Sequence, residues 1–133
     1  MNSKRIIATV LAIATISSIG AIGASARQVG QFDNFTVTYS GNEKFTSYLT
    51  KAVTGRKGVV NLENDSGSAW ITATMRNSDG AYRGGVNLQR GTRKTFATTN
   101  AQAGYMYRLG LRKTNNTGGG SVTIKGSWSP DKS

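Results

Sequence analysis

The sequence contains no cysteine and no histidine among its 133 residues. A chain without these residues cannot assemble a Cys-His or Ser-His-Asp nucleophile system, and it lacks the usual ligands of zinc. It also cannot form a disulfide or carry a lipid on an N-terminal cysteine, so the burial of apolar surface has to provide its stability. We therefore expect a non-catalytic protein that uses no metal and no cofactor.

Acidic residues are also scarce. Six aspartates and glutamates stand against 17 lysines and arginines, which gives a formal net charge of +11. Catalysis by paired carboxylates would have to draw on this small set. Glu63 and Asp65 lie two positions apart, but they adjoin a Ser-Gly turn, which explains Asp65 better than catalysis does. The excess of positive charge favours an anionic partner, because such a field raises the rate of encounter with polyanions.

The first 26 residues have the features of a secretory signal peptide. Lys4 and Arg5 precede an apolar run over residues 6–22, and the Ala-Ser-Ala tripeptide at 24–26 provides a small-x-small cleavage site. We expect cleavage after Ala26 and a secreted, wall-associated domain of residues 27–133. An uncleaved membrane anchor is the alternative, but Thr, Ser and Gly dilute the run and no basic cluster follows it. Export without cysteine favours a Gram-positive source.

Polar and apolar residues alternate with a period of two along the mature domain, as in strands with one buried face. The alternating segments are 35–39, 70–75, 82–89, 105–112 and 122–128. Clusters rich in Gly, Asn and Asp separate them and permit turns with positive φ; they lie at 55–58, 64–67, 77–80 and 115–120. The pattern predicts an all-β domain, either a small antiparallel β-sandwich or an open barrel. Its core is expected to contain Trp70, Leu109, Leu111, Ile124 and Trp128.

Residues 43–54 do not follow this pattern. Their apolar residues have helical spacing; they are Phe45, Tyr48, Leu49, Ala52 and Val53. The threonines in the same stretch favour a strand, and no helix-capping residue stands immediately before Phe45. We expect a strand here, with one short helix packed on the sandwich as the alternative.

Two glycine-rich stretches have structural interpretations. Gly84 and Gly85 lie inside a strand pattern, where glycine marks a bulge or the close approach of another backbone. The run over residues 117–121 lacks the Gly-Lys-Ser/Thr ending of a phosphate-binding loop and precedes a strand pattern instead of a helix. We therefore expect a hairpin tip there.

A C-terminal hairpin would gather positive charge on one face. If residues 105–111 pair with residues 122–128 across the 115–120 loop, basic side chains share the outward face. These candidate anion-binding residues are Arg108, Arg112 and Lys125, with Lys113 beside them. Like charges opposite one another destabilise a sheet, so such a face favours an anionic ligand that offsets the repulsion. The alternative is that they are ordinary solvated charges.

A second candidate patch consists of Arg90, Arg93 and Lys94, which the turn at Arg56 and Lys57 would extend. Binding of single-stranded nucleic acid requires exposed aromatic side chains among the cations. The nearby aromatic residues belong to the apolar face, where we expect them in the core; they are Tyr105, Tyr107 and Trp128. Nucleic acid therefore ranks behind cell-envelope polymers as the expected partner.

The C-terminal segment carries a recognisable sequence pattern. Residues 107–115 follow Tyr-Arg-Leu-x-Leu-Arg-x-x-Asn, and after a glycine-rich tip residues 122–131 are Val-Thr-Ile-Lys-Gly-Ser-Trp-Ser-Pro-Asp. This ending resembles that of a family of small secreted Gram-positive proteins of unassigned function, which share a signal peptide, Thr/Asn/Ser-rich strands and a closing Val-x-Gly-x-Trp strand. The Ala-Trp-Ile at 69–71 is a second point of similarity. The resemblance implies a secreted β-fold and no assigned site.

Two classes of function fit these features. The first is a secreted, non-catalytic module that binds an anionic envelope polymer or membrane surface. The second is a secreted antagonist of other bacteria, similar to bacteriocins in size, export signal and positive charge. The sequence does not indicate an oligomeric state.

Overall fold

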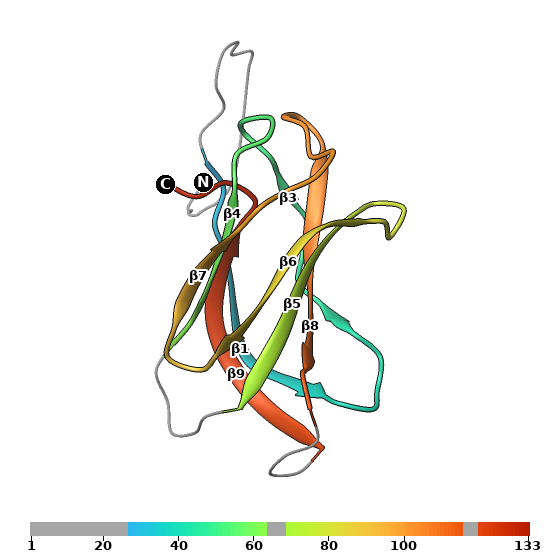
Figure 1. Ribbon diagram of the computed structural model, residues 1–133, viewed down its shortest axis with the longest axis vertical. Helices are drawn as coiled ribbons and strands as arrows, with labels where there is room; N and C mark the ends of the chain where they lie inside the picture. The colour runs from blue at the N-terminus through green and yellow to red at the C-terminus, as the bar shows by residue number, and fades with distance from the viewer. Residues whose placement is uncertain (1–26, 64–68, 116–119) are drawn as a thin grey trace, which may run out of the picture.

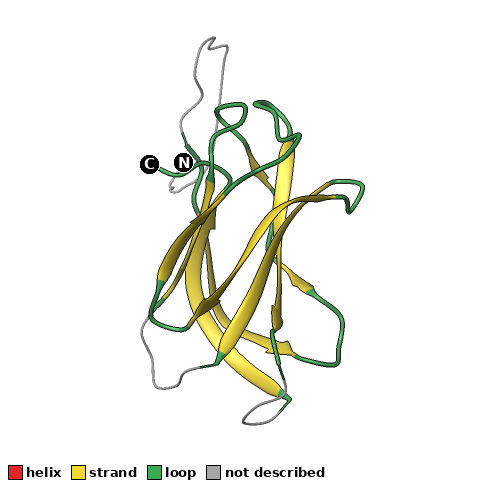
Figure 2. Ribbon diagram, viewed as in Figure 1, coloured by secondary structure: helices red, strands yellow, loops and turns green. Residues whose placement is uncertain are grey.

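The computed structural model describes residues 27–63, 69–115 and 120–133 (Figure 1). Within these ranges the chain forms nine β-strands and no helix (Figure 2). The prediction of an all-β domain is therefore confirmed. No helix capable of crossing a membrane occurs in this part of the chain. The predicted signal peptide, the 64–67 turn with Asp65 and most of the 117–121 glycine run lie outside the described residues.

The strands form two antiparallel sheets that face each other (Figure 1). The four-stranded sheet has the order β1 (Gly30–Thr38), β9 (Ser121–Ser129), β4 (Gly58–Leu62) and β7 (Arg93–Phe96). In the five-stranded sheet, β8 (Met106–Lys113) lies between β5 (Trp70–Asn77) on one side and the short strands β2 (Lys44–Phe45) and β3 (Leu49–Thr50) on the other, and β6 (Tyr82–Gln89) pairs with β5.

The expected C-terminal hairpin does not form. Strand β8 pairs with β5, β2 and β3, whereas β9 pairs with β1 and β4, so the two strands belong to opposite sheets. Both strands carry an apolar face, and in a two-layer sandwich these faces meet across the core instead of lying side by side. The prediction that β8 and β9 share an outward face is therefore wrong.

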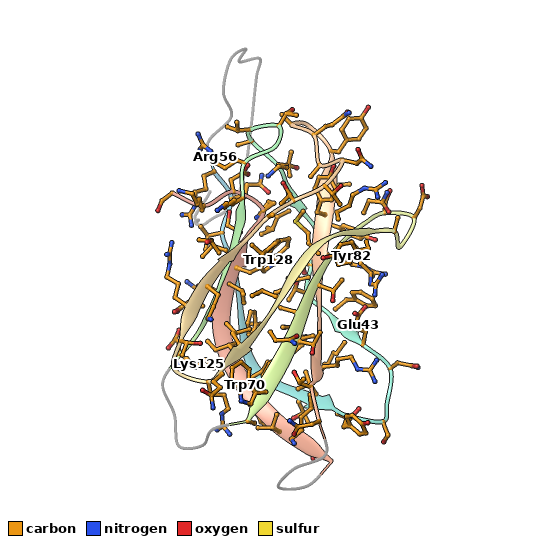
Figure 3. All side chains as sticks on the ribbon, viewed as in Figure 1. Glu43, Arg56, Trp70, Tyr82, Lys125 and Trp128 are labelled. Carbon is orange, nitrogen blue, oxygen red and sulfur yellow. The ribbon has the colours of Figure 1, made fainter. Side chains whose placement is uncertain are left out.

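The core lies between the sheets and contains four of the five residues named for it from the sequence, together with Tyr107; the expectation that Tyr105 is also in the core is wrong, because its side chain is 62% exposed. Leu109, Leu111, Ile124 and Trp128 are almost completely buried, and Figure 3 shows Trp128 between the layers. Trp70 is the exception, because its side chain is 40% exposed. Strand β5 turns its alternate face inward, and the buried residues of that face are Ile71, Ala73 and Met75.

Residues 43–54 form neither a continuous strand nor a helix. The two-residue strands β2 and β3 both pair with β8, and the chain between them leaves the sheet. At this interruption the Thr46 Oγ1 accepts a hydrogen bond from the Leu109 backbone N–H (3.1 Å), while the Thr46 N–H donates to the Leu109 carbonyl (2.9 Å). The threonine therefore maintains the connection to β8 where the helical spacing of the apolar residues suggested a turn of helix.

The glycine pair in β6 has the expected structural role. The pairing register between β5 and β6 shifts next to Gly84, as in a β-bulge. Gly84 has a φ of +148°, and a Cβ there would lie 2.6 Å from the carbonyl oxygen of Ala97. Both the bulge and the close backbone approach are therefore confirmed.

Candidate anion-binding surface

The segment before β1 is joined to the end of β9 and the residues that follow it, at one end of the sandwich. The Arg27 Nε donates a hydrogen bond to the Asp131 carbonyl (2.5 Å), and the Ser129 hydroxyl donates to the Gln28 carbonyl (2.5 Å). The Gln28 side-chain oxygen accepts from the Thr50 N–H (2.7 Å). We call residues 27–28, 50–57 and 129–132 the clasp, because they connect both ends of the described chain to the loop after β3.

A buried ion pair lies at the centre of the clasp. The side chains of Lys51 and Asp131 are both 0% exposed, and the Lys51 Nζ lies 3.2 Å from Asp131 Oδ1. The same ammonium donates to the carbonyls of Arg56 (2.6 Å) and Pro130 (2.5 Å). With three oxygen acceptors its three hydrogens are satisfied, as a buried charge requires.

The Asp131 carboxylate also bonds to the backbone of the clasp. It accepts hydrogen bonds from the N–H groups of Ala52 (2.7 Å) and Val53 (3.1 Å). Burial lowers the pKa of Lys51 from its ordinary value, and the neighbouring Asp131 carboxylate opposes this effect. Because both charged groups are fully enclosed and bonded within the protein, the pair holds the clasp together and offers no surface to a ligand.

Basic side chains surround this closed pair. The Lys132 N–H bonds to the Lys57 carbonyl (2.7 Å), which places two lysines side by side, and Figure 3 shows Arg56 at the same end of the sandwich. Burial lowers the pKa of Arg27, and repulsion from Arg93 lowers it further, against the attraction of Asp131. We call these residues the basic cluster; it consists of Arg27, Arg56, Lys57, Arg93 and Lys132.

The basic cluster is poorly neutralised. The carboxylate that attracts Arg27, that of Asp131, is already held by Lys51. In the described parts of the chain, no carboxylate forms an ion pair with Arg56, Lys57, Arg93 or Lys132. The register Arg93–Asn61–Ser127 places Arg93 on the outer face of the four-stranded sheet, because the neighbouring Val60 points into the core. The cluster thus extends from the clasp onto a polar sheet surface.

The structure separates the four residues expected on one hairpin face. Arg108 and Arg112 lie on the outer face of β8. Lys113 lies at the end of β8 on the inner face, where it is 2% exposed and its Nζ donates to the Asn115 carbonyl (2.8 Å). Lys125 belongs to the opposite sheet and lies 3.8 Å from Glu63 in an exposed ion pair. The expectation that these four cations share one outward face is therefore wrong, because it depended on the hairpin.

The second predicted patch is partly retained. Arg90 follows β6, whereas Arg93 and Lys94 belong to β7. As neighbours in one strand, Arg93 and Lys94 point to opposite faces, with Arg93 opposite Asn61 and Lys94 opposite Val60. Arg93 joins the basic cluster, as do Arg56 and Lys57, which the sequence placed beside the same patch.

Sequence reasoning missed Arg27, Lys132 and the buried pair of Lys51 and Asp131. These residues are brought together by contacts between the two ends of the domain, and local spacing carries no signal for such contacts.

The described residues contain no group of three or more His, Cys, Asp or Glu side chains suited to a metal ion. Comparison of the chain with protein-family models, with curated protein sequences and with solved structures finds no match.

Proposed function

We propose that the protein is a non-catalytic binding module for an anionic polymer of the bacterial surface, and that the basic cluster is its contact site. The observation that carries this proposal is the accumulation of like charge around a carboxylate that is already neutralised. Arg27 and Arg93 lie close enough for their repulsion to lower the pKa of Arg27. A polyanion laid across the cluster relieves this repulsion.

The exposed position of the cluster favours a polymer over a small ligand. Arg56, Lys57 and Arg93 are exposed, and they extend from the loop before β4 to the start of β7. A small anion contacts only the cations next to it, whereas a chain of repeated anionic groups contacts several cations in turn. Attraction between exposed charges is screened over about 8 Å at physiological ionic strength, so the binding must weaken as salt rises.

A salt-dependent pull-down tests the proposal. The purified protein is mixed with Gram-positive cell walls that carry their anionic polymers, at low and then at high salt. We expect the protein to stay bound to the walls at low salt and to be released from them at high salt. The variant Lys57→Glu with Arg93→Glu should lose most of its retention, while Lys44→Glu with Lys125→Glu, which changes the net charge equally outside the basic cluster, should keep more of it.

Two results would contradict the proposal. Retention that does not respond to salt would mean that charge is not the main attraction. An equal loss of retention in the two double variants would show that only the net charge matters and that the basic cluster is not a site. Thermal denaturation of each variant checks that the loss does not arise from unfolding.

A further inference from the structure

The outer face of the five-stranded sheet carries two large exposed aromatic side chains. Trp70 is 40% exposed at the start of β5, and Tyr82 is 53% exposed at the start of β6. The register places Tyr82 opposite Arg76, six residues along β5 from Trp70, which corresponds to about 20 Å. Figure 3 shows the two side chains near opposite ends of the β5–β6 hairpin. Tyrosine and tryptophan, which combine an apolar ring with one polar group, are enriched at interaction surfaces.

The surface between the two aromatic residues is low, polar and uncharged. Thr72 lies opposite Asn87, and Thr74 lies opposite Gly85. Thr74 is nearly buried and Gly85 has no side chain. The Tyr82 ring reaches to 3.5 Å from the position that a Cβ of Gly85 would occupy, so it lies along the sheet. Hydroxyl and amide groups thus form a flat polar strip along β5 and β6, which we call the track, with Trp70 at one end and Tyr82 at the other.

Positive charge lies along one side of this track. On β8, Arg112 is opposite Thr72, and Arg108 is opposite Arg76. Arg76 is neutralised by Glu43, whose two carboxylate oxygens accept hydrogen bonds of 2.8 and 3.2 Å. Arg112 makes a hydrogen bond to the carbonyl of Tyr39 (2.6 Å), which does not neutralise its charge.

Arg108 is held in place without a carboxylate partner in the described parts of the chain. Its guanidinium carbon lies 3.8 Å from the centre of the Phe45 ring and 5.1 Å from that of Tyr48, as in a cation–π contact. Its Nε is buried and has no hydrogen-bond partner among the described residues. The Glu43 carboxyl group lies beside Gly110, between Arg108 and Arg112 on the same face of β8, but it is held by Arg76. Among the described residues neither Arg108 nor Arg112 forms an ion pair, so their charges are complementary to acidic groups on a ligand.

We propose that the outer face of β5, β6 and β8 binds a polysaccharide that carries acidic groups. Its sugar rings pack their apolar faces on Trp70 and Tyr82, its hydroxyls bond to the polar track at Thr72 and Asn87, and its acidic groups lie toward Arg108 and Arg112. This surface belongs to the sheet opposite Arg93, so the inference does not depend on the basic cluster. It adds a second site and a chemical class of ligand.

The arrangement favours a polysaccharide over single-stranded nucleic acid. Nucleic acid carries one charge per nucleotide, and proteins that bind it line the backbone path with cations while the bases stack on aromatic rings. Here the track between Trp70 and Tyr82 is uncharged, and Arg108 and Arg112, which form no ion pair among the described residues, lie on one side of it. Widely spaced acidic groups on a chain rich in hydroxyls match this pattern better.

Tryptophan fluorescence offers a direct test, because the chain has only two tryptophans and Trp128 is buried. We expect hyaluronate or unsulfated chondroitin, each with one carboxylate per disaccharide, to change the emission of Trp70 in a saturable way, and Trp70→Phe to abolish the change. Tyr82→Ala, followed through the remaining Trp70 signal, should weaken binding about tenfold. Arg112→Gln should weaken binding as well. Polyphosphate, which has no rings, should leave the Trp70 emission unchanged.

The two proposals fail separately in this experiment. Absence of a Trp70 response to both polysaccharides would overturn the inference, as would unchanged affinity in Tyr82→Ala. An oligo-dT strand that binds Trp70 more tightly than either polysaccharide would replace it with nucleic-acid binding. Loss of wall retention in Lys57→Glu with Arg93→Glu, together with an intact Trp70 response, supports two independent sites.

Discussion

Replacement of Asp131 by alanine provides the sharpest test of the buried ion pair. The change removes the carboxylate that contacts the Lys51 ammonium at 3.2 Å and accepts the N–H groups of Ala52 at 2.7 Å and Val53 at 3.1 Å. Lys51 would remain enclosed with two carbonyl acceptors and no negative charge. Removal of one partner of a buried pair costs about 3–5 kcal/mol. At about 4 °C per kcal/mol for a domain of this size, Tm should fall by about 12–20 °C.

A second variant separates the charge from the other contacts. Lys51→Met combined with Asp131→Ala removes both charges, and apolar replacement of a whole buried pair is often neutral or stabilising. Urea denaturation should therefore show the double variant to be more stable than Asp131→Ala alone. As a control, Glu63→Ala breaks the exposed contact with Lys125 and should cost at most about 1 kcal/mol. If Asp131→Ala costs no more than this control, or if the double variant is less stable than the single one, the reasoning is refuted.

Three further predictions concern stability. Trp128→Ala should lower the free energy of unfolding by about 3–5 kcal/mol, because it empties a large buried site; an unchanged urea midpoint would contradict this. Gly126→Ala should destabilise the protein more than Gly80→Ala in the same assay. A Cβ at Gly126 would collide with the carbonyl oxygen of Asn61. Gly80 has a φ of +85° but open space around it, so Gly80→Ala should cost only about 1 kcal/mol. Burial lowers the pKa of Lys51, so the unfolded chain keeps this proton to higher pH than the folded chain does. The free energy of unfolding of the parent, measured relative to that of Lys51→Met, should therefore rise as the pH approaches 10.5.

The faces of the strands were predictable from the sequence, but the choice of the buried face was not always so. In β5 the alternation is clear, with Trp70 on one face and Ile71 and Met75 on the other. The size of tryptophan favoured the wrong face. In the folded protein the buried face is the one with three apolar side chains, those of Ile71, Ala73 and Met75. Together these side chains remove more apolar surface from water than one tryptophan flanked by threonines would.

The partners of the strands were harder to predict than the strands themselves. The 115–120 segment has the composition of a hairpin turn, yet β8 and β9 lie in different sheets. Composition indicates that the chain can turn, but it does not indicate whether the next strand pairs beside the last one or crosses to the facing layer. The first candidate site depended on that choice, and Lys113 and Lys125 were therefore grouped wrongly with Arg108 and Arg112.

The basic cluster depends on contacts that span almost all of residues 27–133. Lys51 and Asp131 are 80 positions apart, and Arg27 meets Asp131 across 104 positions. No local periodicity relates such positions, and a lone aspartate near the C-terminus is usually a solvated surface charge. In the fold it is enclosed and paired with Lys51, so its charge is already engaged beside the surrounding cations.

The two proposed surfaces lie on different sides of the sandwich, which affects how the protein would engage a cell wall. Arg93 lies on the outer face of the four-stranded sheet, whereas Trp70 and Tyr82 lie on the outer face of the other sheet, and packed sheets are about 10 Å apart. One straight polymer cannot contact both faces, so simultaneous binding requires two chains or a chain that bends around the edge. In a wall where such chains are dense, the second contact forms at high effective concentration and adds avidity. The protein should therefore bind intact wall more tightly than it binds an isolated anionic polymer or acidic polysaccharide in solution. A variant that lacks one of the two surfaces should bind wall and isolated polymer about equally, through the surface that remains.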